Sequence, residues 1–432
     1  MAVKPKLALI PSGVKANKVY SVLPADGVGD FDFSRSGSAT RINKDGLIET
    51  VDSNVPRLNY PMIDGVVSGC PSLLLEPQSL NSQTNSEDLS DASSFPLGAV
   101  SVSVNQIISP NGTLNADKLI ESNTNARHEL YGKSLNFSGT TSVSFFAKAA
   151  ERRYISVFVG GDPNVGGATF DVQDGLITLS SGGTTSNIEK YPNGWYKCSF
   201  TSTYLGTQNV YYCLRDNGNA VDVQTYQGDG ISGMYLWGFQ TEIGQSYPTS
   251  YIPTTTSATT RSAETCNGAG DANTFNDSEG VLMVETSALA NDLNIEAISI
   301  NANNADNRLA LFKWNVSNRI QIRVNIAGNT PIDAGVSVSN IEDLNKISLK
   351  YKSGDYALWI NGFEVYVNSL ADTPIGLSNL SFDSNGSNGV PFYGNTKQIQ
   401  YFDTALTDTD LEELTSWTSF NEMAQAQLYK TY

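Results

Sequence analysis

The stretch RIQIRVNIA (319–327) decides the fold class, because polar and apolar residues alternate along it without interruption. Successive side chains of a β-strand point to opposite faces, so Ile320, Ile322 and Val324 share one face and the polar residues between them share the other. This alternation is typical of an antiparallel strand with one face on a core and the other in water.

Strand-like runs of similar length surround this stretch from about residue 267 to 406. They are EGVLMVETSA (279–288), IEAISINA (295–302), NRLALFKW (307–314), NKISLKYKSG (345–354), DYALWINGFEVYVN (355–368) and TKQIQYFDTAL (396–406). Asn361-Gly362 supplies the positive φ angles of a type I′ hairpin turn, which fixes the strand register. We therefore expect an antiparallel sandwich over 267–417.

An earlier block, 86–256, shows the same pattern. Its seven runs are SVSFFAKA (142–149), YISVFVGG (154–161), ATFDV (168–172), LITLSS (176–181), GWYKCSFTSTY (194–204), NVYYCLRD (209–216) and GMYLWGFQTEIG (233–244). Regularly spaced short strands separated by Gly, Asn and Asp turns predict a second antiparallel sandwich. Asp174-Gly175 is a candidate hairpin turn.

The remaining segments are shorter. Residues 1–85 form an irregular leader in which LIETV (47–51) and SLLLEP (72–77) are candidate single strands, and we expect the leader to pack against a later domain or a partner. The Thr/Ser-rich segment 257–266 is expected to be a linker, because it has no apolar face. Removal of 1–85 is therefore expected to leave two folded sandwiches.

The end of the chain differs from everything before it. Asp408-Thr409-Asp410 precedes LEELTSW, whose apolar residues at 411, 414 and 417 share one face of a predicted short helix. The tail 418–432 is expected to continue as a helix with Met423, Ala426 and Tyr429 on one side. That apolar face would need a partner.

Composition excludes several classes of function. Lys and Arg number 27 against 44 Asp and Glu, so the formal net charge is −17, and no basic run offers a surface for nucleic acid. No window approaches the length of a membrane span. The apolar run Leu7 to Ile10 is too short for a signal peptide. With 40% hydrophobic and 10% aromatic residues, the chain has enough apolar side chains for packed cores.

Cysteine and histidine are scarce. Cys70, Cys198, Cys213 and Cys266 fit no metal-binding spacing and are expected to be free thiols, with a Cys198–Cys213 pair as the alternative. The single histidine, His128, has no nucleophile motif beside it, and a structural position at a surface or strand edge is expected. We therefore expect no enzyme activity, no catalytic residues and no metal centre.

The leader carries a family resemblance. DFDFSRSGSATRINKDGLIETVDSNVPRLNYP (30–61), followed by LLLEPQSLN (73–81), resembles a leader of fibre and spike proteins of tailed bacteriophages. The resemblance implies a segment that docks on the virion or on other copies of the chain, with capping of the first sandwich as the alternative. The candidate contact residues are Phe33, Ser34, Arg35, Ser36, Ser38, Ala39, Thr40 and Arg41.

Two further resemblances refine the fold class. YPNGWYKCSFTST (191–203) and the segment 237–264 resemble the closing strands of a carbohydrate-binding-module-like jelly roll. LNKISLKYKSGDYALWINGFEVYVN (344–368) and the segment 396–417 resemble a concanavalin A-like or laminin-G-like sandwich. The expected fold is therefore all-β, with a jelly roll and a concanavalin A-like sandwich, an irregular leader and a short C-terminal helix.

These resemblances imply a structural protein of a phage virion, made in the bacterial cytoplasm and displayed on the virion surface. The chain has no repetitive shaft, which favours a short head fibre, spike or decoration protein that contributes to attachment to host-surface glycans. A tail fibre or receptor-binding adhesin, and a decoration protein without ligand, are the alternatives. The expected partners are other capsid or tail proteins, further copies in a dimer or trimer, and host polysaccharide.

Sugar binding needs exposed aromatic rings beside polar groups. The glycan-binding candidates are Trp314, Tyr393, Tyr235 and Trp195, with core packing as the alternative. Trp237 and Trp359 lie inside apolar strands and are expected in the core. The glu-x-asp-x-x-glu motif of concanavalin A-like hydrolases does not occur. The loops 271–277, 301–307 and 383–388 contain Asn and Asp oxygens suited to a structural calcium ion, but solvated turns are the favoured interpretation.

Overall fold

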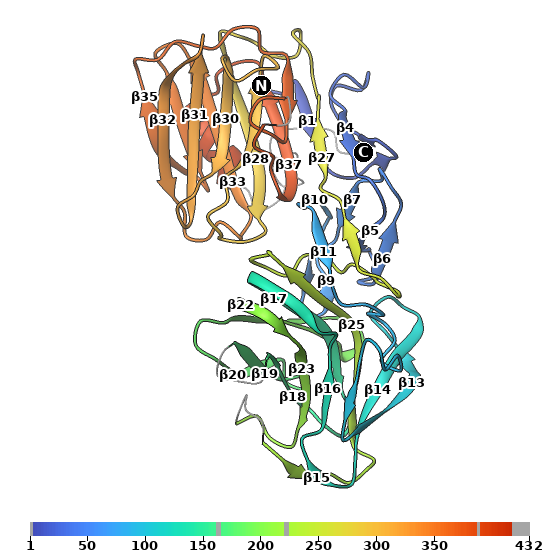
Figure 1. Ribbon diagram of the computed structural model, residues 1–432. Helices are drawn as coiled ribbons and strands as arrows, with labels where there is room; N and C mark the ends of the chain where they lie inside the picture. The colour runs from blue at the N-terminus through green and yellow to red at the C-terminus, as the bar shows by residue number, and fades with distance from the viewer. Residues whose placement is uncertain (1–2, 161–165, 220–223, 387–388, 417–432) are drawn as a thin grey trace.

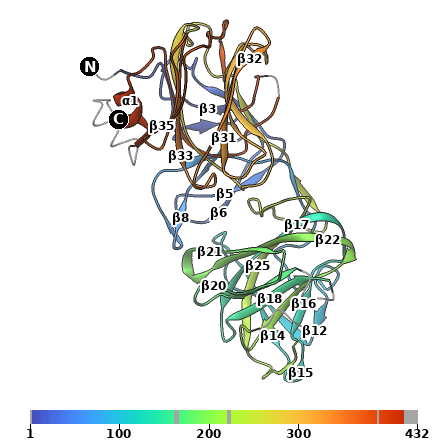
Figure 2. The ribbon, with the colours of Figure 1, turned by 90° about the vertical axis from the view of Figure 1, so that its left-hand side faces the viewer.

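The computed structural model describes residues 3–160, 166–219, 224–386 and 389–416. Two β-sandwiches lie one above the other, and strands of the leader occupy the waist between them (Figures 1 and 2). Every strand pair among the described residues is antiparallel, which confirms the predicted all-β class. No helix within the described ranges is long and apolar enough to cross a membrane.

The sandwich of the 86–256 block consists of two six-stranded sheets. One has the order β12 (Leu97–Gly98), β16 (Glu129–Tyr131), β23 (Val210–Arg215), β18 (Tyr154–Val159), β19 (Gly167–Asp171) and β20 (Leu176–Ser180). The other, called the waist sheet here, has the order β13 (Val100–Ile108), β14 (Leu114–Glu121), β25 (Gly233–Ile243), β17 (Leu135–Ala149), β22 (Tyr196–Gln208) and β21 (Thr185–Lys190). All seven predicted runs of this block form strands.

The C-terminal sandwich consists of a large and a small sheet. The small sheet has the order β32 (Asn329–Ser337), β31 (Arg319–Ile326), β30 (Arg308–Lys313), β29 (Glu296–Asn301) and β36 (Asn379–Ser381). The large sheet has the order β35 (Phe363–Asn368), β34 (Tyr356–Ile360), β33 (Asn345–Lys352), β28 (Glu279–Ala288), β37 (Gly394–Phe402), β10 (Ser72–Leu75) and β7 (Arg57–Asn59), and β1 (Leu7–Leu9) also pairs with β37.

The leader is therefore part of the C-terminal sandwich. Three of its strands extend the large sheet, and Leu7, Phe33 and Leu73 lie in the same hydrophobic core as the residues of the small sheet. A further sheet joins β2 (Val14–Lys15), β3 (Lys18–Val19) and β4 (Phe31–Ser34) to β27 (Thr265–Asn267). Because the leader supplies core residues, we now expect that the C-terminal sandwich does not fold without residues 1–85. This replaces the expectation from the sequence that removal of the leader leaves both sandwiches folded.

The segment 257–266, expected to be a linker, is instead built into the fold. β26 (Thr259–Arg261) pairs with β11 (Ser79–Asn81), so the chain enters and leaves the first sandwich through one two-stranded neck. Arg261, Glu264 and Cys266 are buried. The sequence pattern does not reveal this segment as buried, because two of its buried side chains are charged and pair with residues of the leader: Arg261 with Glu76, and Glu264 with Arg35 and Arg57.

Shorter pairs complete the leader and the loops of the first sandwich. They are β5 (Ala39–Ile42) with β6 (Ile48–Val51), β8 (Met62–Ile63) with β9 (Val66–Val67), and β15 (Asn125–Ala126) with β24 (Tyr226–Gln227). A 3₁₀ turn covers Pro192–Gly194. The predicted strands at 47–51 and 72–77 are confirmed by β6 and β10.

Two local predictions for the C-terminal sandwich are confirmed. Asn361 and Gly362 have φ angles of 51° and 88° and form the two-residue turn between β34 and β35. Helix α1 (Asp408–Ser416) buries Leu411 and Leu414 against the outer face of the large sheet. Trp417 and the tail 418–432, with Met423, Ala426 and Tyr429, lie outside the described residues.

The polar face of β31 differs from its expected solvated state. Gln321 and Asn325 are buried, and the amide oxygen of Asn325 accepts a hydrogen bond from Arg308 Nε at 3.0 Å. The guanidinium of Arg323 lies over the ring of Trp314. Alternation therefore identified the strand, while the packing of polar side chains on its outer face depends on neighbouring strands.

Candidate functional site

A buried ionic joint holds the waist together. Arg57 of β7 donates to Glu76 Oε2 at 2.6 Å and pairs with both carboxylate oxygens of Glu264, and the side chains of Arg57 and Glu264 have no exposed surface. Arg35 Nη1 adds a bond to Glu264 Oε1 at 2.7 Å. Arg261 Nη1 lies 2.8 Å from Glu76 Oε2. The joint therefore brings together three arginines and two glutamates from four chain segments, because Arg261 and Glu264 lie in the same stretch.

The ionic joint reaches the first sandwich through the segment that follows β25. Ser250 donates its backbone N–H and its hydroxyl to the carboxylate of Glu76, at 2.8 and 2.6 Å. Arg261 Nη1 donates to Thr249 Oγ1 at 3.0 Å. Burial alone would raise the pKa of Glu76, but Arg261 and Arg57 outweigh it and lower the pKa to about 2. Glu76 is therefore a permanent anion at neutral pH.

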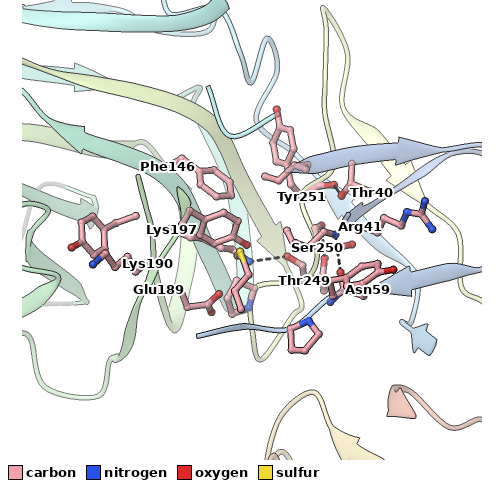
Figure 3. Close-up of a pocket in the computed structure, with 18 of the residues that line it drawn as sticks. Thr40, Arg41, Asn59, Phe146, Glu189, Lys190, Lys197, Thr249, Ser250 and Tyr251 are labelled. Carbon is pink, nitrogen blue, oxygen red and sulfur yellow. Dashed lines mark hydrogen bonds between the residues drawn. The ribbon is translucent and has the colours of Figure 1, made fainter. Parts of the chain in front are cut away.

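A cleft of about 650 Å³ opens beside the ionic joint, between the waist sheet and the leader. In Figure 3, Phe146 and Lys197 come from one side, Thr40, Arg41 and Asn59 come from the other, and Ser250 and Tyr251 lie between them. A cavity of this size at an interface between structural units is the usual form of a site for a small ligand. The waist cleft, as we call it, is also lined by Ile42, Tyr60, Met62, Asp64, Asp174, Glu189, Lys190, Tyr191, Tyr196, Leu289 and Asn395.

Aromatic rings supply much of the lining of the waist cleft. Tyr60 follows β7 and is half-buried, while Tyr191 and Tyr196 flank the Pro192–Gly194 turn of the first sandwich. Within the described residues, the hydroxyls of Tyr60 and Tyr191 have no hydrogen-bond partner. Tyrosine combines a flat apolar face with a polar tip, so this lining suits the rings and hydroxyls of a sugar.

The leader encloses the waist cleft through two turns that need glycine. A Cβ on Gly46 would lie 2.8 Å from Pro192 Cγ, and one on Gly65 would lie 2.8 Å from Tyr191 O. Both glycines have positive φ, at 77° and 78°. The turns at 43–46 and 62–67 therefore press closely on the 190–194 turn.

The charges of the waist cleft are mixed. Asp64, Asp174 and Glu189 contribute carboxylates, as does the ion-paired Glu76. Lys190 and Lys197 contribute ammonium groups, and Arg41 contributes a guanidinium. Burial, with Asp174 as the largest electrostatic contributor, raises the pKa of Tyr196, which therefore stays neutral at physiological pH. The waist cleft can offer both donors and acceptors to a polar ligand.

Four of the eight candidate virion-contact residues are buried in the chain itself. Phe33 lies in the core of the C-terminal sandwich, Arg35 in the ionic joint, and Ala39 and Thr40 beside the waist. Thr40 Oγ1 donates to Tyr251 O at 2.5 Å. These four residues therefore pack within the chain, and the prediction that they contact the virion is corrected. Three candidates are exposed, namely Ser34, Ser36 and Ser38, and Arg41 is half-buried against Glu49 and lines the waist cleft.

None of the four glycan-binding candidates lines the waist cleft. Trp195 is 1% exposed, and its Nε1 donates to Ile108 O at 3.0 Å, so the alternative of core packing applies. Tyr235 is half-buried among the apolar residues on the outer face of the waist sheet. Tyr393 is half-buried against the core of the C-terminal sandwich. Trp237 and Trp359 are buried as expected.

Trp314 is half-buried and directly follows β30. Its half-buried ring meets Phe312 edge-on at 5.7 Å and lies under Arg323, whose Cζ is 5.0 Å from the ring centre. One face of the indole is thus already covered by a guanidinium. Trp314 therefore packs against Phe312 and Arg323, which leaves less of its ring free to stack on a sugar than the sequence suggests.

A carboxylate pair lies outside the waist cleft. Lys313 forms ion pairs with Asp292 and, at 3.5 Å, with Glu296. Burial raises the pKa of Glu296 to about 7, against the opposing influence of Lys313, and the pKa of Asp292 is lowered because bonding and attraction from Lys313 outweigh burial. Asp292 and Glu296 both pair with Lys313, and neither of them lines the waist cleft.

The other residues singled out from the sequence have local structural roles. His128 is buried, and its Nδ1 and Nε2 lie 2.8 Å from Ala99 O and 3.2 Å from Tyr226 O. The four cysteines are free, as predicted, with Cys70 exposed. Cys198 and Cys213 belong to different sheets.

The three loops rich in Asn and Asp use their side chains for turns. Asp271 Oδ1 accepts the backbone N–H groups of Asn273 and Thr274 at 2.9 Å, and Asp383 Oδ1 accepts that of Asn385 at 2.8 Å. Across the described part of the chain, no three His, Cys, Asp or Glu side chains gather as they would around a metal ion.

Comparisons with known proteins give weak likenesses. No family model and no curated protein matches the chain. Among solved structures, the sialidase CBM40 of Ruminococcus gnavus bound to α2,3-sialyllactose is 16% identical, with a TM-score of 0.29, over 34% of this chain and 93% of that one. Domain 4 of the arabinanase AbnA of Geobacillus stearothermophilus is 12% identical, with a TM-score of 0.29, over 35% and 73%. Domains LG4-5 of mouse laminin α1 are 10% identical, with a TM-score of 0.23, over 81% and 96%.

The residues of the waist cleft were missed because no single segment marks them. Tyr60 lies in the leader and Lys197 and Tyr196 in β22, and the sequence places them more than one hundred residues apart. The usable signal was the polar and aromatic character of YPNGWYK around the buried Trp195. Its outer members, Tyr191, Tyr196 and Lys197, line the waist cleft.

Proposed function

We propose that this protein is a lectin-like structural component of a phage virion, and that it binds host-surface glycans in the waist cleft. The observation that carries the binding proposal is the cleft itself, a space of about 650 Å³ lined by tyrosines and by charged and amide side chains. Sugars bind proteins through aromatic faces and hydrogen bonds to hydroxyls, and this lining offers both. The ionic joint holds the two walls in a fixed relation, which lowers the entropy lost on binding.

The virion assignment is supported by the resemblance of residues 30–61 to leaders of phage fibre and spike proteins. Since Arg35 and Arg57 of that stretch are buried inside the chain, docking would fall to the exposed Ser34, Ser36 and Ser38. A head fibre, short spike or decoration protein, displayed as a dimer or trimer, is the form we propose. Localisation of the chain on intact particles by cryo-electron microscopy tests this directly.

The binding proposal is tested with the intact chain on an array of bacterial surface polysaccharides. Tyr60→Ala should lower the affinity for every bound glycan by up to about tenfold, since a stacked aromatic ring contributes about 0.5–1.5 kcal/mol. Tyr20→Ala is the matched control, because Tyr20 is exposed and lies outside the waist cleft. Equal losses in both variants, or no binding by the intact chain, would contradict the proposal.

A decoration protein without ligand is the second candidate. Two observations favour it: Trp195, expected to contact a glycan, is buried, and Arg35, expected to contact the virion, is buried in the ionic joint. Normal incorporation into particles combined with a blank polysaccharide array would select this candidate. We propose no hydrolytic activity for either form, and size analysis of polysaccharide after incubation with the protein tests that point.

A further inference from the structure

Lys197 lines the waist cleft and has few bonding partners there. Its side chain is nearly buried, with the residue 9% exposed, and Nζ makes one long hydrogen bond, 3.4 Å, to Thr249 O. Within the described residues Nζ has no ion pair. An ammonium group has three donors and loses hydration on burial, so this arrangement leaves most of its bonding capacity unused.

Other buried lysines of the chain show what a satisfied ammonium looks like here. Lys313 pairs with Asp292, and Lys350 lies 2.8 Å from Asp355 Oδ1. Both residues are buried to about the same degree as Lys197. Lys313 and Lys350 thus each have a carboxylate partner within the fold, whereas Lys197 lines a cavity.

The nearest carboxylate along the sheet is turned elsewhere. Glu189 of β21 lies directly opposite Lys197 in the register of the waist sheet. Its Oε1 accepts a hydrogen bond from Asn187 Nδ2 at 2.9 Å, and the residue is exposed. Figure 3 shows Lys197 directed toward Thr249 and Glu189 separate from it. An anionic group of a ligand in the waist cleft could therefore lie beside Lys197.

We propose that the waist cleft takes an acidic saccharide, whose carboxylate pairs with Lys197 while its ring lies against the tyrosines. This inference rests on the proposed function, since it names the class of glycan for the same cleft. The lining favours a singly charged ligand, because Asp64, Asp174 and Glu189 also line the cleft and repel a dianionic phosphate more strongly than a carboxylate. A charge-assisted hydrogen bond in a site of low exposure is worth more than a neutral one.

The test compares uronic-acid polysaccharides, such as alginate and hyaluronan, with their carboxyl-reduced forms. The intact wild-type chain should bind an acidic polymer at least about tenfold more tightly than its reduced form, as expected for one charge-assisted bond. Lys197→Gln should remove that preference, since glutamine is polar but carries no charge. Lys197→Arg should retain much of the preference. Lys15→Gln, at an exposed lysine of the leader, is the matched control.

The outcomes separate the two proposals. Binding of both polymer forms with equal affinity, unchanged in Lys197→Gln, would overturn the acidic-saccharide inference and leave glycan binding in place. Binding of dextran sulfate as tightly as the uronic-acid polymers would overturn the assignment of a carboxylate. Failure of the wild-type chain to bind any of these polymers, or the array polysaccharides, would overturn both proposals.

Discussion

Arg57 and Glu264 lie 207 residues apart in the sequence, and their side chains meet in a bidentate pair that is fully buried at the waist of the molecule. Arg57 belongs to β7 at the edge of the large sheet, and Glu264 follows the neck strand β26. The pair therefore joins the leader to the segment that returns from the first sandwich. It fixes the geometry in which the waist cleft forms.

Removing the charge at the centre of the ionic joint should destabilise the protein. Glu264→Gln leaves Arg57 and Arg35 without their shared carboxylate, and breaking a buried ion pair is expected to lower the free energy of unfolding by about 3 kcal/mol. Urea unfolding followed by circular dichroism measures this loss. Asp32→Asn, which breaks the exposed Lys18–Asp32 pair, should change stability by less than about 1 kcal/mol. Equal effects of the two substitutions would refute the structural role of the joint.

The two sandwiches should differ in their ability to fold alone. Among the described residues, the core between the two sheets of the first sandwich is formed by residues between 89 and 243, so a fragment covering 86–256 should unfold cooperatively. A fragment beginning at 267 lacks β1, β7 and β10 and the core residues Leu7, Phe33 and Leu73. It should remain unfolded. Thermal unfolding and amide NMR spectra test both fragments, and a folded C-terminal fragment would contradict this prediction.

Stability should fall in acid because of Glu76. Its pKa in the folded state, about 2, is below the ordinary value of 4.5. The stabilisation from this carboxylate is therefore complete above the unfolded pKa and is lost as pH falls from about 4.5 toward 2. One pKa unit corresponds to about 1.4 kcal/mol, so the loss is up to about 3 kcal/mol. Unfolding of wild type and Glu76→Gln between pH 2.5 and 6 should show a steeper fall in the wild type.

Glu296 should produce the opposite dependence. Its folded pKa of about 7 exceeds the ordinary 4.5, so its contribution is complete below pH 4.5 and is lost as pH rises through 7. Glu296→Gln removes this titration. The melting temperature of the variant relative to wild type should therefore rise between pH 5 and pH 8. A difference that stays constant over that range would show that Glu296 does not titrate there.

The regular elements were predictable because their signals are local. Each predicted strand run, from SVSFFAKA to TKQIQYFDTAL, forms a strand, since alternation and β-branched composition act over a few residues. The Asn361-Gly362 turn was predictable because its positive φ angles depend on two residue types. β32 was missed because NTPIDAGVS has neither clear alternation nor a high apolar content.

The sequence by itself determined the all-β class, the order of the two strand-rich blocks and the short helix, because these follow from side-chain periodicity and turn chemistry. Only the tertiary structure decided that the leader belongs to the C-terminal sandwich, that 257–266 is buried, and that Lys197 faces a cleft beside Tyr60. Those features arise from pairings between distant segments. A buried arginine and a solvated one look alike in sequence, and the carboxylate that makes burial favourable for Arg57 lies two hundred residues away.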